Sequence, residues 1–332
     1  MKYINLGNAG IKVSILGIGT WHLPGTGKYN DQGIEYVDND TFSKIFRKAY
    51  DSGINFFDTA NIYHGRVEHN EDCINCTGNS EKILGELIKD YERESLVIST
   101  KVRGPMANYV NASGLSRKHI MNQIKESLKR LHTDYIDLYQ FHWSDNEVSL
   151  IETLKTMSHI IDMDYARYIG MSNVNASDIC DFMYLSEKHN LNSFSTIQEP
   201  YNILNRGIED NKLIYAKKYN LGLLAYTPLD QGVLTGKYLL NYDKSSRIHY
   251  YPELKREIDR TEEKVKKLKE LADNKGITLS QLSIAWILKM SEKLDIKIIP
   301  LLGITKLQHL TDNLEALNVN LKNEDIKYIN KL

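Results

Sequence analysis

Residues 96–142 read LVISTKVRGPMANYVNASGLSRKHIMNQIKESLKRLHTDYIDLYQFH, two short apolar runs separated by a longer amphipathic segment. The runs at 96–101 and 136–142 are rich in β-branched and aromatic residues, which is typical of buried strands. Residues 116–131 repeat apolar side chains at helical spacing and begin at Ser116, a favoured N-cap residue. A strand, a crossover helix and a second strand form a parallel unit, so this stretch predicts an α/β protein.

The same alternation runs along the whole chain of 332 residues. It predicts eight strands, at 14–19, 55–58, 96–101, 136–142, 168–171, 195–198, 221–226 and 296–300. It also predicts eight helices, at 40–51, 80–91, 116–131, 148–163, 176–189, 208–219, 279–289 and 306–317. Eight strand-helix units close on themselves as a (β/α)8 TIM barrel, so we expect a single domain over residues 1–332.

Segments outside these units have expected places in the barrel. The opening KYINLGNAGIKVSIL, residues 2–16, is typical of a β-hairpin turning at residues 8–10, and we expect it at the barrel floor. Connections at 62–79 and from 227 to roughly 260 exceed tight loops, which is typical of functional segments. The charge-rich stretch EEKVKKLKELADNKG, residues 262–276, is expected to be a solvated helix.

Composition narrows the class of protein. Hydrophobic residues make up 42% and charged residues 26% of the chain, proportions typical of a soluble globular protein. Forty-two basic against 43 acidic residues leave a net charge of −1, so we expect a small-molecule partner and neither nucleic acid nor membrane. The start lacks a secretory signal, and Cys73, Cys76 and Cys180 do not form a disulfide framework, so a cytoplasmic location is expected. No heptad pattern predicts an oligomeric state.

Three ionisable residues end successive predicted strands: Asp58 the second, Lys101 the third and His142 the fourth. In a TIM barrel the active site lies at the carboxyl ends of the strands. Adjacent strands lie about 4.8 Å apart, so the three side chains meet at one rim. An ordinary salt bridge and a capping histidine explain any one of them alone, but three buried ionisable groups together indicate a catalytic site.

Tyr63 lies five residues beyond Asp58, in a loop that can reach over the barrel mouth toward Lys101. One tyrosine among 21 is by default a packed aromatic residue. A phenol has an ordinary pKa of about 10, and a nearby ammonium group lowers it. We therefore expect Lys101 to lower the pKa of Tyr63 and Asp58 to hold the lysine. His142 is expected to orient the oxygen that is protonated.

These residues resemble a known catalytic tetrad. DTANIYHG at 58–65, STK at 99–101 and QFHW at 140–143 are similar, in order and position, to the Asp, Tyr, Lys and His motifs of the aldo-keto reductases. The resemblance covers essentially the whole chain, through YINLGNAGIKVSILGIGTW, SEKILGELIK, YIGMSN, IQEPYN, LLAYTPLDQGVLTGKY and IIPLLGITKLQHLTDNLEAL. It is strongest toward the branch that includes potassium-channel β-subunits and aldehyde-reducing bacterial and archaeal relatives. It implies reduction of an aldehyde or ketone by a nicotinamide cofactor, with Tyr63 as general acid.

The resemblance also implies where the cofactor binds. Ser172, Asn173 and Gln198 would hydrogen-bond the carboxamide, and Tyr226 would stack on the nicotinamide ring. The remaining implied cofactor contacts follow strand ends and a helix start, and they are Gly19, Thr20, Trp21, Thr227, Pro228, Leu229, Gly232, Lys237, Gly303, Thr305, Lys306, His309 and Asn313. Backbone N–H groups and the helix dipole at such a start favour the anionic phosphates.

The expected cofactor is NADP(H). NADP-preferring relatives often have an arginine where this chain has His309, so recognition of the 2′-phosphate is expected to rest on Thr305, Lys306 and Lys237. A Rossmann fingerprint is absent, because GIGTWH lacks the third glycine at the required spacing. GVLTGKY also fails as a P-loop, because its glycine gap is one residue short.

The region after Tyr63 is longer than the loop common in the family, and it contains His64, His69, Cys73 and Cys76. A zinc site, a redox pair of the two cysteines, and an ordinary substrate-shaping loop are all compatible with this composition. The spacing matches no zinc finger, so the substrate-shaping loop is favoured and no metal is expected.

Trp21 and Trp143 lie beside predicted strand ends and are expected to line an apolar substrate pocket. The favoured function is an NADP(H)-dependent carbonyl reductase that acts on a small aldehyde or ketone. The alternative is a cofactor-binding regulatory or adaptor subunit with slow redox chemistry. A metal-dependent hydrolase is disfavoured. It would require two histidines one residue apart after the first strand, and only His22 is present there.

Overall fold

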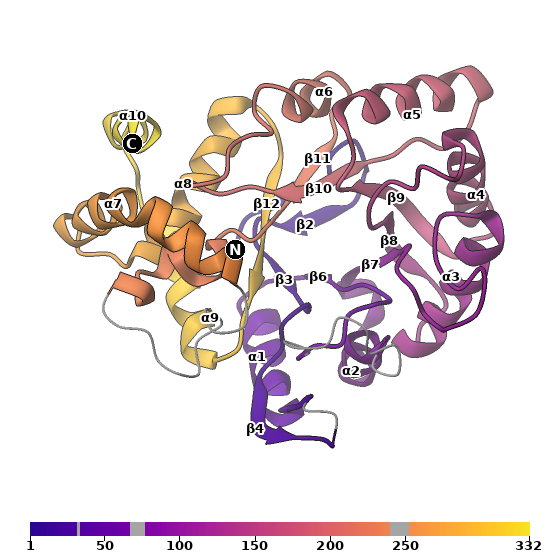
Figure 1. The fold of residues 1–332 in the computed structure, drawn as a ribbon, viewed down its shortest axis with the longest axis horizontal. Coiled ribbons are helices and arrows are strands. Elements are labelled where there is room, and N and C mark those ends of the chain that lie inside the picture. The colour runs from indigo at the N-terminus through magenta and orange to yellow at the C-terminus, as the bar shows by residue number, and fades with distance from the viewer. Residues whose placement is uncertain (32–33, 67–76, 240–251) are drawn as a thin grey trace.

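Parallel strands form a closed barrel at the centre of the computed structural model (Figure 1). The structure describes residues 1–31, 34–66, 77–239 and 252–332. The barrel strands are, in chain order and in ring order, β3 (Gly17–Gly19), β6 (Phe56–Asp58), β7 (Val97–Val102), β8 (Ile136–Phe141), β9 (Ala166–Ser172), β10 (Thr196–Pro200), β11 (Gly222–Tyr226) and β12 (Ile298–Gly303). β12 pairs back to β3 and closes the ring, so the predicted (β/α)8 architecture is confirmed.

Helices alternate with the strands and cover the outside of the barrel (Figure 1). They are α1 (Asn39–Asp51), α2 (Asn79–Ile88), α3 (Arg117–Leu131), α4 (Leu150–Asp162), α5 (Ala176–His189), α6 (Lys212–Lys218), α8 (Leu279–Leu294) and α9 (Leu307–Leu314). Their apolar faces pack on the strands. Phe46 of α1, for example, stacks on Phe57 of β6 with ring centroids 4.3 Å apart. Strands covered in this way are apolar on both faces, which explains their continuous apolar sequences.

The N-terminal hairpin closes the floor of the barrel, as predicted. β1 (Tyr3–Asn5) pairs antiparallel with β2 (Lys12–Ser14), and Leu6 in the turn is fully buried among inward-facing strand residues. Gly7 in the same turn has φ +61°, and a Cβ there would lie 2.1 Å from the carbonyl oxygen of Ser195. Only glycine fits that close approach. The open end of the barrel is therefore the opposite one, at the carboxyl ends of the strands.

Several expected boundaries are wrong. The helix expected at 208–219 spans only residues 212–218 as α6, the one expected at 80–91 ends at residue 88, and the one expected at 279–289 continues to residue 294. The first barrel strand begins at Gly17, because Ser14 ends β2 and donates a 2.6 Å hydrogen bond from Oγ to the Leu16 carbonyl. The loop expected to reach residue 260 is helical from residue 252, where α7 (Pro252–Asn274) begins. This helix also buries one face, because its apolar residues recur at helical spacing: Leu254, Ile258, Val265, Leu268 and Ala272. Elements that the sequence did not predict are β4 (Gly25–Tyr29), β5 (Glu35–Val37) and α10 (Asn323–Lys331).

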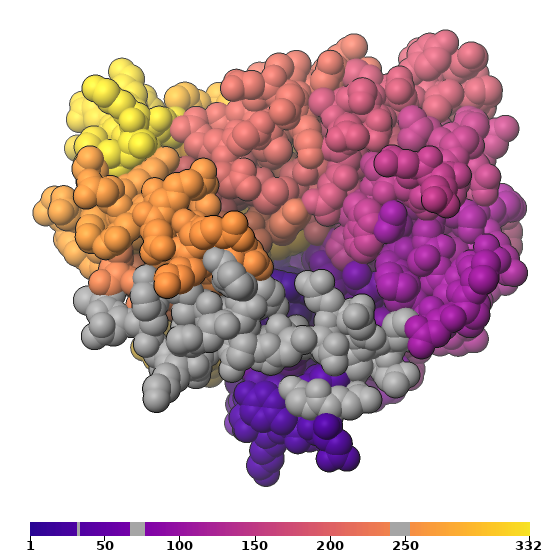
Figure 2. Space-filling model, in the orientation of Figure 1, coloured from indigo at the N-terminus to yellow at the C-terminus, as the bar shows by residue number. Residues whose placement is uncertain are grey.

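The molecular surface is hollowed near the centre of the face shown in Figure 2, over the middle of the ring of strands seen in Figure 1. N-terminal residues, coloured indigo, lie at the bottom of this hollow. In the part of the chain that the structure describes, no helix has the length and apolar character required to cross a membrane.

Candidate active site

Lys101 lies near the carboxyl end of β7 and is completely buried. Its ammonium group donates to Asp58 Oδ2 at 2.5 Å, to the Thr59 carbonyl at 2.9 Å and to Tyr63 Oη at 3.2 Å. These three acceptors use all three N–H groups of the ammonium. Because an ammonium group can only donate, the phenol oxygen accepts this bond, and the phenol hydrogen is directed elsewhere. Tyr63 therefore keeps a proton that it can give to another group.

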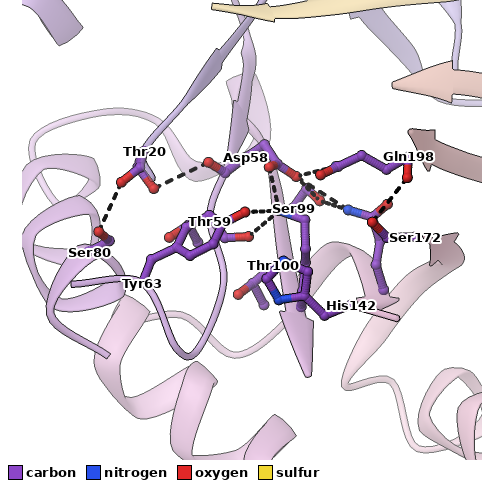
Figure 3. Close-up of polar contacts among 12 residues, drawn as sticks. Thr20, Asp58, Thr59, Tyr63, Ser80, Ser99, Thr100, His142, Ser172 and Gln198 are labelled. Atoms are coloured by element: carbon purple, nitrogen blue, oxygen red, sulfur yellow. Dashed lines mark hydrogen bonds and ion pairs between the residues drawn. The ribbon is translucent and has the colours of Figure 1, made fainter. Parts of the chain in front are cut away.

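Asp58 ends β6 and is 2% exposed. Its second oxygen, Oδ1, accepts hydrogen bonds from Ser99 Oγ at 2.9 Å, from Gln198 Nε2 at 3.0 Å and from Gln140 Nε2 at 3.3 Å. In Figure 3 the labelled side chains of Tyr63 and Gln198 lie on opposite sides of Asp58. Ser99 of β7 and Gln140 of β8 were not predicted from the sequence. Each precedes a predicted site residue by two positions, the spacing that places strand side chains on one face.

The rings of Tyr63 and His142 pack edge to face, with centroids 5.5 Å apart and planes at 72°. The loop that carries Tyr63 can approach the end of β7 because Gly104 has no side chain there. A Cβ at Gly104 would lie 2.2 Å from Cγ2 of Ile62. His142 directly follows β8, and its backbone N–H donates to Val102 O at 2.9 Å. The structure thus brings together all four predicted residues: Asp58, Tyr63, Lys101 and His142 (Figure 3).

The members of this cluster shift one another's pKa. Burial by itself lowers the pKa of Lys101, but Asp58 and Tyr63 outweigh burial and raise it, so the amine stays protonated. Burial raises the pKa of Tyr63 above 10 although Lys101 lowers it, so the expected net decrease is wrong. Burial, together with the charges of Lys101 and Arg103, lowers the pKa of His142 well below 6.5. At neutral pH the cluster holds a charged amine, a protonated phenol and a neutral imidazole, a set suited to proton donation.

Comparison with known proteins agrees with this geometry. The model of the Aldo/keto reductase family matches residues 15–332, nearly the whole chain. The chain belongs to the aldo/keto reductase family. Proteins of this family act on small carbonyl compounds and generally use NAD(P)H, so family membership supports an oxidoreductase.

Three similar proteins carry two kinds of name. A protein of Saccharomyces cerevisiae named as the aryl-alcohol dehydrogenase AAD16 is 32% identical, over 99% of this chain and 96% of its own length. A Schizosaccharomyces pombe protein, also named as an aryl-alcohol dehydrogenase, is 31% identical over 98% and 93%. A protein of Arabidopsis thaliana named as a voltage-gated potassium channel β-subunit is 32% identical over 96% and 92%. The two names describe an enzyme and a channel subunit on one family fold.

The residues that the resemblance assigns to the carboxamide form one wall of the site in this aldo/keto reductase. Tyr226 Oη donates to Asn173 Oδ1 at 2.7 Å, and Asn173 Nδ2 donates to the carbonyl of His142 at 2.9 Å. Ser172 Oγ donates to the Gln198 carbonyl at 3.0 Å. Tyr63 also contributes to raising the pKa of Tyr226, after burial and Glu199, so the two phenols share one region. An aromatic ring and side-chain amides beside the tetrad fit a nicotinamide ring and its amide.

The segment after β11 suits a phosphate group. Thr227, Asp230 and Gln231 have φ values of 50°, 47° and 52°, and Gly232 has 97°. The N–H groups of Asp230 and Gly232 donate to the carbonyls of Thr227 and Leu229 at 2.9 Å, so the segment folds as tight turns, a conformation that can present its other N–H groups to an anion. Pro228 and Leu229 lie inside this segment. The side chain of Lys237 passes close to Gly232, because a Cβ at Gly232 would lie 2.7 Å from Cε of Lys237.

The start of α9 suits the adenosine end of a dinucleotide. Its N-cap residue, Lys306, makes no side-chain cap bond, and its carbonyl accepts the His309 N–H at 3.0 Å, so an anion would meet the N–H groups that precede His309 in the first turn. Partial burial and the charges of Lys306 and Lys237 lower the pKa of His309, which shows that these three basic side chains share one region. Thr305 precedes the cap, and Asn313 is buried in the same helix.

Glycines open the rim between β12 and β6. The register pairs Gly303 with Gly19 and Gly19 with Asp58, so two residues without side chains stand beside the tetrad carboxylate. A Cβ at Gly303 would meet nothing within 4 Å. Thr20 is fully buried and donates from Oγ1 to the Asp58 carbonyl at 3.2 Å, so its side chain joins β3 to β6. Trp21, which follows, is 45% exposed.

The remaining candidates lie around the loops. Trp143 packs beside His142 with ring centroids 4.8 Å apart, and the guanidinium of Arg103 lies 4.7 Å from the indole centroid. Arg103 is not among the residues predicted from the sequence. The carbonyl of His64 accepts a 2.8 Å hydrogen bond from the side chain of Asn79. His69, Cys73 and Cys76 lie outside the described residues, and within the described ones no three His, Cys, Asp or Glu side chains cluster as metal ligands.

Proposed function

We propose that this aldo/keto reductase is an NADP(H)-dependent oxidoreductase that reduces aldehydes and ketones to alcohols, with residues 1–332 as one domain. The observation that carries the proposal is the position of Lys101, which donates at once to Asp58 and to the oxygen of Tyr63. A salt bridge that only stabilised the fold would not need a hydrogen bond to a phenol that also packs against His142. The family match supports the same reaction class.

Each member of the tetrad has a defined task. When bound, the nicotinamide supplies the hydride that reduces the carbonyl carbon. Tyr63 gives its O–H proton to the carbonyl oxygen, and Lys101 stabilises the phenolate that remains. Asp58 holds Lys101 and balances its charge in the buried site. His142, neutral because its pKa is low, donates a hydrogen bond to the same carbonyl oxygen. Its Nδ1 is buried and has no hydrogen-bond partner among the described residues.

The preference for NADP(H) over NAD(H) rests on the basic side chains near the start of α9, one of which comes from the segment after β11. Lys306 and Lys237 are exposed and act together on His309, so a third negative charge on the adenosine ribose would lie among cations. Charge-assisted hydrogen bonds to phosphate are among the strongest polar contacts in proteins. The 2′-phosphate is the group that NADP(H) has and NAD(H) lacks, so these residues favour the former.

A substrate panel tests the proposal. We expect purified protein to oxidise NADPH in the presence of aromatic or aliphatic aldehydes, with saturation in both substrates, and to use NADH less efficiently. Product analysis must show one alcohol formed per NADPH consumed. A complete lack of turnover on every aldehyde and ketone, with either cofactor bound, would reject the enzymatic proposal.

A second candidate is a cofactor-binding regulatory subunit, favoured by the 32% identity to a protein named as a potassium channel β-subunit. In that case NADPH would bind stoichiometrically while turnover stayed below about 0.01 s⁻¹, far under the range usual for enzymes. We favour the enzyme, because all four groups needed for proton transfer meet in hydrogen-bonding or ring contact.

A further inference from the structure

Arg103 stands two residues beyond Lys101, just past the end of β7. Its φ of 146° is unusual for a residue other than glycine, and its carbonyl accepts a 2.8 Å hydrogen bond from the Gly114 N–H. A non-glycine residue held in such a conformation stores strain that the surrounding structure must offset, and such residues cluster at functional sites. The backbone therefore holds this side chain at the mouth of the barrel.

The guanidinium of Arg103 lies beside the proton-donating groups. It stacks 4.7 Å from the centroid of the Trp143 ring, and Trp143 in turn packs against His142. The charge of Arg103 contributes to the low pKa of His142, after burial and Lys101, so it is close enough to act on the imidazole. A ligand whose carbonyl oxygen reaches Tyr63 and His142 would extend past this guanidinium.

Arg103 has no acidic partner among the described residues, and its buried Nε has no hydrogen-bond acceptor there. Three other partly buried arginines each pair with a carboxylate at 2.6 to 2.8 Å: Arg93 with Asp137, Arg130 with Glu81, and Arg206 with Glu209. The acidic residue of the neighbouring loop, Asp145, is instead bonded to the backbone N–H groups of Leu115 and Glu147. A partly buried guanidinium without an acceptor is costly, so an external anion would complete it.

The phosphates of a dinucleotide are not that anion. The basic side chains suited to them, Lys237 and Lys306, belong to the segments after β11 and β12. Arg103 follows β7, which is separated from β12 by β3 and β6 in the ring. An anion bound at Arg103 would therefore lie on the substrate side of the site.

We propose that Arg103 binds an oxyanion of the carbonyl substrate, a carboxylate or a phosphate, and holds it against Trp143 while the carbonyl group reaches Tyr63. This inference rests on the proposed reductase function and names its preferred substrate class. The planar fork of an arginine matches two oxygens of either anion. The structure thus assigns substrate selection to a residue outside the tetrad.

The test compares carbonyl compounds that differ only in charge. The substrates are the ortho, meta and para isomers of carboxybenzaldehyde, their uncharged methyl esters, and formylphenyl phosphate. For the wild-type protein we expect kcat/KM with NADPH to be at least about tenfold higher for one anionic isomer than for its ester. A preference for the carboxylate or for the phosphate identifies which oxyanion the site accepts. Equal values for charged and uncharged substrates would overturn the inference.

Variants test whether Arg103 causes the preference for the anionic substrate. Arg103→Gln is expected to lower kcat/KM for the anionic substrate by about 10- to 100-fold and to leave the ester almost unchanged. Arg103→Lys should give an intermediate value, because it keeps the charge and loses the fork. Arg117→Gln, an exposed arginine at the start of α3, removes the same charge elsewhere and should change neither substrate. If Arg103→Gln slows both substrates equally, the residue serves only to support Trp143 and the proposal is wrong.

A binding measurement separates this inference from the proposed reaction. Benzoate and phenyl phosphate are expected to quench tryptophan fluorescence of the wild-type protein, in a manner weakened by salt and by Arg103→Gln, whereas benzyl alcohol is not. Trp143→Phe should remove the signal and identify its source. Binding that depends on Arg103 without any turnover would reject the reductase and keep the anion site. Turnover of the esters without anion binding would reject the anion site and keep the reductase.

Discussion

Gln198 Nε2 donates a 3.0 Å hydrogen bond to Oδ1 of Asp58, the carboxylate whose other oxygen holds Lys101. The two residues are 140 positions apart and belong to β10 and β6. The family resemblance assigns this glutamine to the cofactor carboxamide. Its side-chain nitrogen supports the buried ion pair, so one residue links the tetrad with the wall of the site that includes Ser172.

This link predicts a stability effect. Gln198→Leu should lower the free energy of unfolding by about 1–3 kcal/mol, because a buried carboxylate loses a hydrogen-bond donor. Urea unfolding of the apo protein, followed by circular dichroism, measures the change. Lys327→Gln, an exposed substitution on α10, is the control and should have no effect. An unchanged unfolding free energy for Gln198→Leu would show that the bond to Asp58 does not contribute in solution.

The role of the phenol predicts the result of removing one oxygen. Tyr63→Phe should reduce kcat for aldehyde reduction by about 10²-fold or more, the effect of losing a general acid. The ring remains, so its packing against His142 and the affinity for NADPH should change little. Steady-state kinetics and a fluorescence titration with NADPH check the two halves of the prediction. Normal turnover by this variant would remove Tyr63 from the mechanism.

The buried ion pair of Lys101 and Asp58 predicts that a single substitution destabilises the fold more than a double substitution does. Lys101→Met leaves Asp58 as an unpaired buried charge and should destabilise the fold by about 3–5 kcal/mol. Combining it with Asp58→Asn should restore most of that stability, because both charges are then gone. Neither variant should reduce aldehydes. Restored activity in the double variant would show that the ammonium is not needed to stabilise the phenolate.

The pKa shifts predict how the rate depends on pH. Reduction needs the protonated phenol, and burial raises the pKa of Tyr63 above 10, so kcat/KM for reduction should fall only above about pH 10. Oxidation of the alcohol needs the phenolate, so its rate should rise with pH throughout the range from 7 to about 10. Profiles in both directions on one substrate pair provide the measurement. A reduction rate that already declines between pH 7 and 8 would contradict the raised pKa.

The basic side chains at α9 predict cofactor preference. Titration of protein fluorescence should show tighter binding of NADPH than of NADH. Lys306→Gln should weaken NADPH binding by about five- to tenfold and leave NADH almost unaffected, because only the former carries the 2′-phosphate. Lys327→Gln again serves as the control. Equal dissociation constants for the two cofactors in the wild-type protein would remove the basis for an NADP(H) preference.

Most of the architecture and three residues of the tetrad could be predicted from the periodicity of the chain. Tyr63 was predicted from its place in the loop after Asp58 and from the family resemblance. Asp58, Lys101 and His142 each end, or nearly end, an apolar run, and parallel strands bring such ends together. The supporting residues Ser99 and Gln140 were not predicted, because only the residues at the strand ends were considered and not those two positions earlier on the same strand face. The start of α7 was placed in a loop because its charged residues outnumber the apolar residues that it buries.

The sequence by itself determined the barrel, the closed floor and the identity of four reactive groups at one end. These features depend on spacing along the chain, which short-range sterics and apolar burial translate directly into strands and helices. Only the tertiary structure decided the direction of the pKa shift of Tyr63, because burial and the charge of Lys101 oppose each other and their balance depends on distance and solvent exposure. It also decided that Arg103 lies against Trp143 with no carboxylate in reach among the described residues, since pairing between side chains from different loops exists only after the barrel has closed.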